Sequence, residues 1–92
     1  MATVKIPPVL RPQTGGDAEV PAPGATVGEV LTALAEEHPG ARSQLFADGG
    51  ELNRYVNVYV NDEDVRVLDG LDTPVSDSDT VVILPAMAGG LR

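Results

Sequence analysis

Hydrophobic and polar residues alternate along the first part of the chain, which is typical of strands with one buried face. Residues 2–6 (ATVKI) alternate in this way and are followed by two prolines, and residues 17–20 (DAEV) form a second short segment of this kind. The Gly15-Gly16 pair between them suits a hairpin turn. The N-terminal part of the chain therefore predicts two strands joined by a turn.

A helical pattern follows these segments. Thr26 stands three residues before Glu29, which is the spacing of a capping box at a helix start. The apolar residues then recur at helical intervals, at Val27, Val30, Leu31, Leu34 and Ala35. We predict one amphipathic helix over about residues 27–38, ended by the His38-Pro39-Gly40 sequence, and a short helical turn over residues 41–46.

The second half of the chain returns to a period of two. Valines at 56, 58 and 60 alternate with Tyr55, Asn57 and Tyr59, which predicts a half-buried strand. Residues 61–64 (NDED) predict a turn, and residues 65–68 (VRVL) predict the return strand. Residues 80–84 (TVVIL) are apolar at four successive positions, which is typical of a strand buried, or nearly so, on both faces.

These elements predict an α+β fold with a four- to five-stranded sheet and one main helix packed on one face. The predicted core is made by Val4, Ile6, Val30, Leu31, Leu34, Val58, Val60, Val81 and Ile83. One helix covers only one face of such a sheet, so the outward side of the last strand should expose part of an apolar segment. Exposed apolar patches mark docking surfaces, so we expect a partner to dock around Val81, Val82, Ile83 and Leu84.

Composition narrows the class of protein. The 92 residues are enough for one domain, are 42% hydrophobic and include no cysteine, so we expect a core without disulfides. The longest apolar stretch, residues 81–91, is shorter than the ~20 residues of a spanning helix. We expect a soluble, cytoplasmic protein.

The charge of the chain excludes several partners. Fourteen acidic residues against six basic ones give a net charge of −8, which disfavours nucleic acid and anionic membranes as partners. The acidic surface serves solubility, and it can also steer the protein toward a basic surface on a partner protein.

The chain carries no recognisable catalytic or metal-binding motif. It has no P-loop and no G-x-G-x-x-G sequence, and its single histidine, His38, is placed to interact with the negative end of the predicted helix rather than with a catalytic partner. The acidic 61–64 segment lacks the glycine and the ligand spacing of a calcium loop. We therefore expect neither an enzyme nor a metal site.

The last residues, PAMAGGLR (85–92), predict no further helix or strand, so we expect a domain over residues 1–85 and a flexible tail over residues 86–92. The five residues from Ala86 to Gly90 can extend over about 17 Å. Glycine at 89 and 90 makes such a tail narrow and leaves the carbonyl of Gly90 unshielded.

Four segments together resemble the ubiquitin-like (β-grasp) sulfur carriers of the MoaD/ThiS type, which have a mixed sheet and the order β-β-helix-β-β-β. The resemblance covers nearly the whole chain, through the segments IPPVLRPQTGG, ATVGEVLTALAEEHPG, RYVNVYVNDEDVR and DSDTVVILPAMAGG. Among these segments, the last strand with its diglycine is the most specific.

The resemblance implies a protein cosubstrate that binds no cofactor itself. In this family an E1-like enzyme uses ATP and Mg²⁺ to adenylate the terminal glycine, here Gly90 with Gly89 as its neighbour, and sulfur then displaces AMP to leave a thiocarboxylate. Residues Ala86, Met87 and Ala88 would deliver that group to a biosynthetic enzyme such as a cysteine synthase. Related carriers supply sulfur to thiamin, molybdopterin or natural products, and the sequence does not choose among these routes.

The chain departs from the family pattern at Leu91-Arg92, which follow the diglycine. We expect a JAMM-type zinc protease to remove them, as in carriers processed by such enzymes. Two alternatives remain open: a protein modifier that forms isopeptide bonds through Gly90, which target conjugates would reveal, and a non-covalent adaptor, whose binding would survive deletion of residues 86–92.

Overall fold

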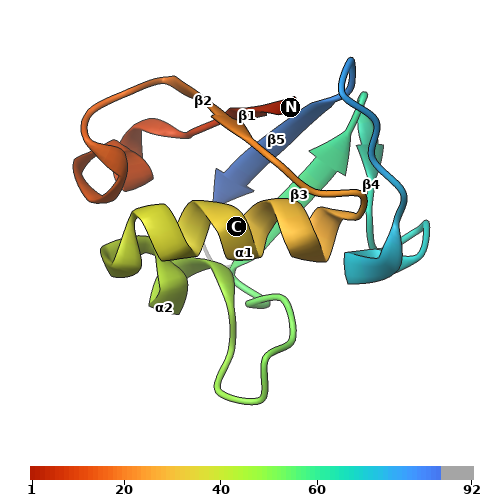
Figure 1. The fold of residues 1–92 in the computed structure, drawn as a ribbon. Helices are drawn as coiled ribbons and strands as arrows, with labels where there is room; N and C mark the ends of the chain where they lie inside the picture. Colours follow the sequence, from red (N-terminus) through yellow and green to blue (C-terminus); the bar gives the residue numbers. More distant parts are fainter. Residues whose placement is uncertain (86–92) are drawn as a thin grey trace.

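The computed structural model describes residues 1–85, which form a sheet crossed on one face by a helix (Figure 1). In chain order the elements are β1 (Ala2–Lys5), the 3-10 helix η1 (Pro8–Thr14), β2 (Glu19–Ala22), α1 (Val27–Glu37), η2 (Pro39–Ala41), α2 (Arg42–Leu45), β3 (Val56–Val60), β4 (Glu63–Asp64), η3 (Gly70–Asp72) and β5 (Thr80–Pro85).

The five strands form one mixed sheet in the order β2-β1-β5-β3-β4. The C-terminal strand β5 lies at its centre, parallel to β1 with Val82 opposite Lys5, and antiparallel to β3 with Ile83 opposite Val58. The predicted α+β class and five-stranded mixed sheet are thereby confirmed.

The predicted capping residues fix both ends of α1. Thr26 Oγ1 accepts a hydrogen bond from the Glu29 backbone N–H at 3.2 Å, and the Glu29 carboxylate accepts one from the Ala25 N–H at 2.9 Å. At the other end the His38 N–H donates to the Leu34 carbonyl at 2.9 Å. These bonds satisfy backbone groups that a helix terminus otherwise leaves without partners.

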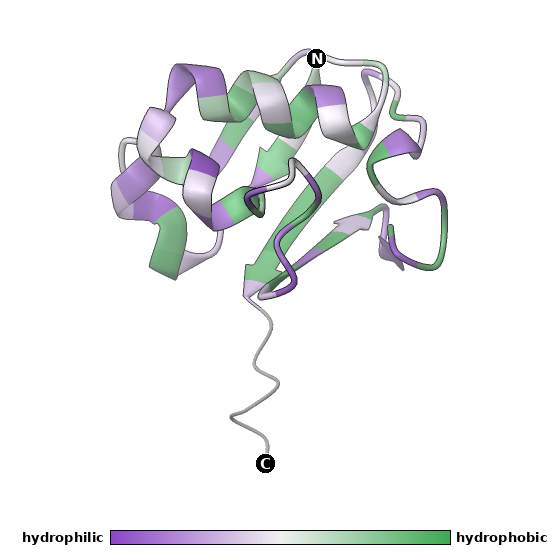
Figure 2. Ribbon diagram, turned by 90° about the horizontal axis from the view of Figure 1, so that it is seen from below, coloured by the Kyte–Doolittle hydropathy of each residue, from purple (hydrophilic) through white to green (hydrophobic). Residues whose placement is uncertain are grey.

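The core lies between α1 and the inner face of the sheet. All nine residues predicted for it are buried, and Val4, Val30, Leu31, Val58 and Val81 are fully so. Figure 2 shows the corresponding hydrophobic colouring along the central strands. Leu45 of the predicted helical turn, now α2, is also buried and closes one end of this core.

The predicted return strand at residues 65–68 is wrong. The turn is formed by Asn61 and Asp62, both with positive φ, and the return strand β4 is limited to Glu63–Asp64. After it, the Asp64 carboxylate accepts a hydrogen bond from the Arg66 N–H at 2.8 Å, and the following N–H groups bond within turns. This local hydrogen bonding ends the strand pairing, and Val67 is left 83% exposed although it continues the apolar alternation.

The connection between the first two strands also differs from the predicted hairpin turn. Pro8–Thr14 form a 3-10 helix that ends at Gly15 with φ of 76°, and β2 begins at Glu19 rather than at residue 17. Leu10 of this 3-10 helix is buried in the core, so burial of one more apolar side chain favours a longer connection.

Among the described residues, no helix is both long enough and apolar enough to cross a membrane.

Candidate functional site

The end of β5 is the part of the described fold closest in sequence to the predicted tail. This strand is hydrogen-bonded on both sides, to β1 and to β3, so its direction is fixed by the sheet. Its last residue, Pro85, pairs in register with Val56 at the start of β3. Proline has no N–H to donate, so the ladder ends naturally here.

The four residues predicted for docking divide between the two faces of β5. Val81 and Ile83 are buried beneath α1, whereas Val82 is half-buried on the outer face and Leu84 is 43% exposed there. Successive side chains of a strand point to opposite faces, so burial takes the first pair away from a docking surface. Only Val82 and Leu84 remain available on the outer face.

Polar residues frame this outward pair. In the strand register Val82 lies between Lys5 of β1 and Tyr59 of β3, and Leu84 lies beside Asn57 of β3. The apolar patch on the outer face is therefore narrow and mixed with polar groups.

On the other side of the strand end, a small apolar niche of about 150 Å³ adjoins Pro85. It is lined mainly by Pro7, Leu10, Tyr55 and Val56. The niche shows that the start of η1 and the start of β3 meet around the end of β5.

Two arginines that the sequence analysis did not single out lie at this end. Arg66 donates to the Asn57 side-chain oxygen at 3.1 Å and to the Asn53 carbonyl at 2.9 Å. The Arg54 guanidinium lies 5.2 Å from the centre of the Tyr55 ring, within the range of a cation–π interaction. They are the first and last residues of the RYVNVYVNDEDVR segment, and it is the strand pairing that brings both of them to the end of β5.

The opposite end of β5 is anchored by Asp79. Its carboxylate accepts hydrogen bonds from the Ser76 backbone N–H and the Asn61 side-chain amide, both at 2.9 Å. These bonds, the Ser76 backbone bond first, hold the pKa of Asp79 below its usual range because they stabilise the ionised form.

The reactive residues predicted from the sequence all lie outside the described residues. They are the predicted sulfur site Gly89 and Gly90, the delivery residues Ala86, Met87 and Ala88, and the extension Leu91 and Arg92. Their roles stay predictions, as does the division of the chain at residue 85.

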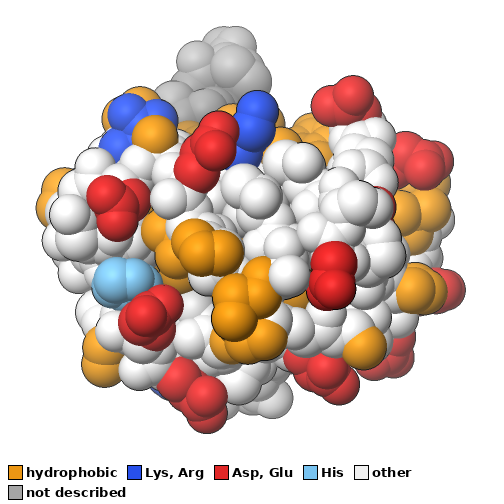
Figure 3. Space-filling model, turned by 45° about the horizontal axis from the view of Figure 1, so that its top comes forward, with side chains coloured by type: hydrophobic (Ala, Val, Ile, Leu, Met, Phe, Trp, Pro, Cys, Tyr) orange, Lys and Arg blue, Asp and Glu red, His pale blue; other side chains and the backbone are white. Residues whose placement is uncertain are grey.

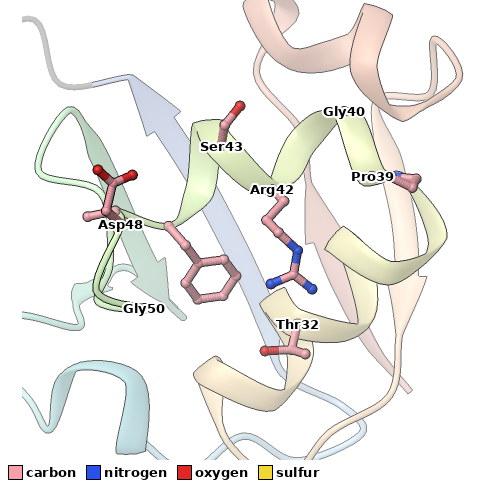
Figure 4. A pocket seen from close by; sticks show the side chains of 9 residues that line it. Thr32, Pro39, Gly40, Arg42, Ser43, Asp48 and Gly50 are labelled. Atoms are coloured by element: carbon pink, nitrogen blue, oxygen red, sulfur yellow. The ribbon is translucent and has the colours of Figure 1, made fainter.

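Within residues 1–85 no side-chain arrangement resembles a catalytic centre. His38 lies at the end of α1, with Glu37 as its nearest acidic neighbour at 4.0 Å. The hollow between α1 and α2 is lined by Thr32, Arg42, Ser43 and Asp48, with no histidine or cysteine to activate the serine (Figure 4). No group of three or more histidine, cysteine or acidic side chains in this part of the chain is placed to hold a metal ion.

A single main helix on one face of a five-stranded mixed sheet, with β5 central between β1 and β3, defines a ubiquitin-like β-grasp protein. The ThiS family model matches residues 4–90 of the chain. The chain belongs to the ThiS family.

The similarity to particular members of this group extends over nearly the full chain. The sulfur carrier protein CysO of Mycobacterium tuberculosis is 50% identical over 90 residues, covering 96% of this chain and 97% of CysO. A chain in the crystal structure of the Amycolatopsis orientalis BexX/CysO complex superposes with a TM-score of 0.89 at 49% identity, covering 98% of this chain and 100% of that one. The protein is thus a sulfur carrier of the CysO type, and such carriers are small substrate proteins rather than catalysts.

Protein modifiers share the fold and part of the sequence. Small archaeal modifier protein 1 of Methanosarcina acetivorans has a TM-score of 0.86 and 34% identity, over 97% of this chain and 95% of that protein. The similar proteins therefore include both carriers and modifiers.

Proposed function

We propose that this protein carries sulfur as a thiocarboxylate on Gly90, after removal of Leu91-Arg92, and donates it in the biosynthesis of cysteine or another sulfur metabolite. The observation that carries the proposal is that the ThiS family match extends to residue 90, the second glycine of the diglycine. The position of β5 supports it, because a strand that is hydrogen-bonded on both sides gives the predicted tail a firm base.

The terminal carboxylate needs activation, because a carboxylate with a pKa near ~3.5 is ionised at neutral pH and resists nucleophiles. An E1-like enzyme would join the Gly90 carboxylate to the α-phosphate of ATP, with Mg²⁺ bound by that enzyme and pyrophosphate released. Sulfide then attacks the Gly90 carbonyl, and AMP leaves with the bonding electrons. The product is a thiocarboxylate, and this chain contributes the carbonyl and no catalytic group.

Delivery requires that Gly90 reach the active site of a second enzyme, and we assign this role to Ala86, Met87 and Ala88. The five residues after Pro85 can extend over about 17 Å. A cysteine synthase is the acceptor that the similarity to CysO favours. We place this protein, with both partners, in the cytoplasm.

Docking to the activating enzyme would use the outer face of the sheet beside Leu84 and Val82. Support comes from the exposure of these two side chains next to the strand end. The BexX/CysO complex supports docking to a partner protein in general, because it contains a 49% identical chain. The narrowness of the apolar patch implies that neighbouring polar groups share in the contact.

The Leu91-Arg92 extension acts as a cap in this proposal, since it holds the Gly90 carbonyl in a peptide bond. A JAMM-type zinc protease would hydrolyse that bond and release the dipeptide. Clipping is therefore the step that makes the carrier competent.

Intact-mass measurement tests the proposal directly. Protein ending at Gly90 should gain about 16 Da, the difference between sulfur and oxygen, when incubated with the E1-like enzyme, ATP, Mg²⁺ and sulfide, whereas protein ending at Arg92 should not. The chemical reason is that only the shortened chain has a glycine carboxylate to adenylate. Gly90→Ala in the shortened chain should slow the reaction by crowding the carbonyl.

A thiocarboxylate on the unclipped chain would contradict the cap. The modifier remains a second candidate because of the 34% identity to small archaeal modifier protein 1. It predicts conjugates to lysines of other proteins in host extracts instead of a free thiocarboxylate, and mass spectrometry of tryptic digests distinguishes the two. An adaptor would keep its partner after deletion of residues 86–92.

A further inference from the structure

The lysines and arginines of the described chain are not used for internal ion pairs, although acidic residues outnumber basic ones by fourteen to six. Within residues 1–85 the ion pairs join the N-terminal amine to Asp77 at 3.3 Å and His38 to Glu37 at 4.0 Å. No lysine or arginine side chain of this range takes part in one. Their charges are therefore available to another molecule.

Three of these cations lie near the residues that flank the end of β5. Arg66 bonds to Asn57, which pairs with Leu84 in the sheet. Arg54 lies two residues before Val56, which pairs with Pro85. Arg11 donates through Nε to the carbonyl of Ile6 at 3.1 Å. Ile6 directly follows Lys5, which pairs with Val82 of β5. We name Arg11, Arg54 and Arg66 the exit arginines, because each contacts a residue near the end of β5.

Arg66 is held in place by neutral groups. Its bonds to the Asn57 amide oxygen and the Asn53 carbonyl use one N–H of each terminal nitrogen and leave the charge without a counter-ion. The other N–H groups of the guanidinium stay free to bind a carboxylate, which the planar fork of arginine can bind with two parallel hydrogen bonds. Because the side chain is already oriented, less rotamer freedom is lost on binding.

Arg54 and Tyr55 extend this surface. Tyr55 is 63% exposed, and the Arg54 guanidinium stays over its ring. Exposed tyrosine and arginine side chains are the types that dominate binding energy at protein interfaces. The nearest acidic residues, Asp48 and Glu51, line the same hollow as Arg54 but make no ion pair with it.

Acidic residues occupy the other end of the sheet. Asp62 and Glu63 lie in the turn after β3, where the Asn61 N–H bonds to the Thr80 carbonyl, and Asp79 anchors the start of β5. In the face shown in Figure 3, the larger blue patches lie toward the upper edge with a red patch between them, and further red side chains are spread over the face. The acidic turn after β3 and the exit arginines thus lie toward opposite ends of β5, although Asp48 and Glu51 line the hollow beside Arg54. Such an arrangement helps to orient the protein in the field of a partner.

We propose that the exit arginines form a docking collar for a partner protein with carboxylates at the mouth of the cleft that admits residues 86–90. This partner is the enzyme that adenylates Gly90, an assignment that rests on the proposed function. A rim of a few carboxylates matches three separate guanidinium groups, whereas a polyanion would be repelled by the net charge of −8. Contact in any other orientation would bring the acidic surface against the same rim and would be disfavoured.

The test measures kcat and KM for thiocarboxylate formation by the E1-like enzyme on protein ending at Gly90, the form in which the proposed function acts. Arg54→Gln and Arg66→Gln should each raise KM about three- to fivefold, and the double variant about tenfold, with kcat within about twofold of the unaltered protein. Arg42→Gln is the matched control and should leave KM unchanged, because the Arg42 side chain lies toward Thr32 in the hollow between α1 and α2 (Figure 4). Raising the salt concentration should increase KM of the unaltered protein more than that of the double variant.

A second variant separates charge from structure. Arg66→Lys keeps the charge but not the fork, so its KM should lie between those of the unaltered protein and Arg66→Gln. Thermal melting confirms that the variants remain folded. If sulfur is gained with the same KM by all variants, the collar is overturned and the proposed function stands. If the unaltered protein gains no sulfur, the proposed function fails. The affinity of the same variants for the enzyme, measured by direct binding, then tests the collar. Equal affinities, or an affinity that rises with salt, overturn the collar.

Discussion

Leu34 illustrates how single residues stabilise this protein. It lies on the inner face of α1 and is 1% exposed, so its side chain fills the space between the helix and the sheet. Leu34→Ala should lower the free energy of unfolding by about 2–5 kcal/mol, because it removes buried methyl groups and leaves a cavity. Urea denaturation measures the change. Glu36→Ala, on the exposed side of the same helix, should stay within about 0.5 kcal/mol, and a near-zero effect at Leu34 would contradict its place in the core.

Residues with opposite exposure alternate along β5, and this alternation decides which of them a partner can reach. The sequence assigned Val81 and Ile83 both to the core and to the docking surface, because four successive apolar residues carry no period of two that would separate the faces. The sheet pairing puts Val81 and Ile83 inside and Leu84 outside.

At the scale of elements, helix boundaries were easier to predict than strand boundaries. The start of α1 follows from Thr26 and Glu29, whose side chains bond to the backbone within a few residues. The short strand β4 could not be predicted from residues 65–68, because the apolar alternation there competes with the turn that the Asp64 carboxylate stabilises.

The loop that leads into β5 should make stability depend on pH. The pKa of Asp79 is lowered in the folded protein, chiefly by the Ser76 backbone bond and then by Asn61, so folding favours the ionised carboxylate. This contribution is present above the unfolded pKa of ~3.9 and is lost as the pH falls through the lower folded pKa. The difference in unfolding free energy between the unaltered protein and Asp79→Asn should therefore be largest near neutral pH and shrink in acid.

Urea denaturation at pH 7, 5 and 3 measures this difference. Asn61→Gly is the matched variant, because glycine tolerates the positive φ at this position while the side-chain donor to Asp79 is lost. It should weaken the pH dependence without abolishing it, since the bond from Ser76 remains. A difference that is the same at all three pH values would show that the Asp79 bonds add nothing to stability.

At the scale of the whole molecule, the buried core residues within 1–85 all lie between Ala2 and Ile83. A chain that ends at Pro85 should therefore melt at nearly the same temperature as the full chain, with the same far-ultraviolet circular dichroism. The control is Leu34→Ala in both chain lengths, which should lower the two melting temperatures equally. A large drop on truncation would mean that residues 86–92 pack against the domain, contrary to a tail that reaches into a partner.

The sequence by itself determined the helix with its caps, the nine core residues, the acidic charge and the diglycine that ends the family match at residue 90. These depend on local spacing and composition, which act within a few residues along the chain. The tertiary structure alone decided that β5 lies at the centre of the sheet, that Leu84 faces outward, and that Arg11, Arg54 and Arg66 each lie beside residues near its end. The physical reason is that strand pairing joins residues far apart in the sequence, and no local pattern in 1–85 specifies which strands become neighbours.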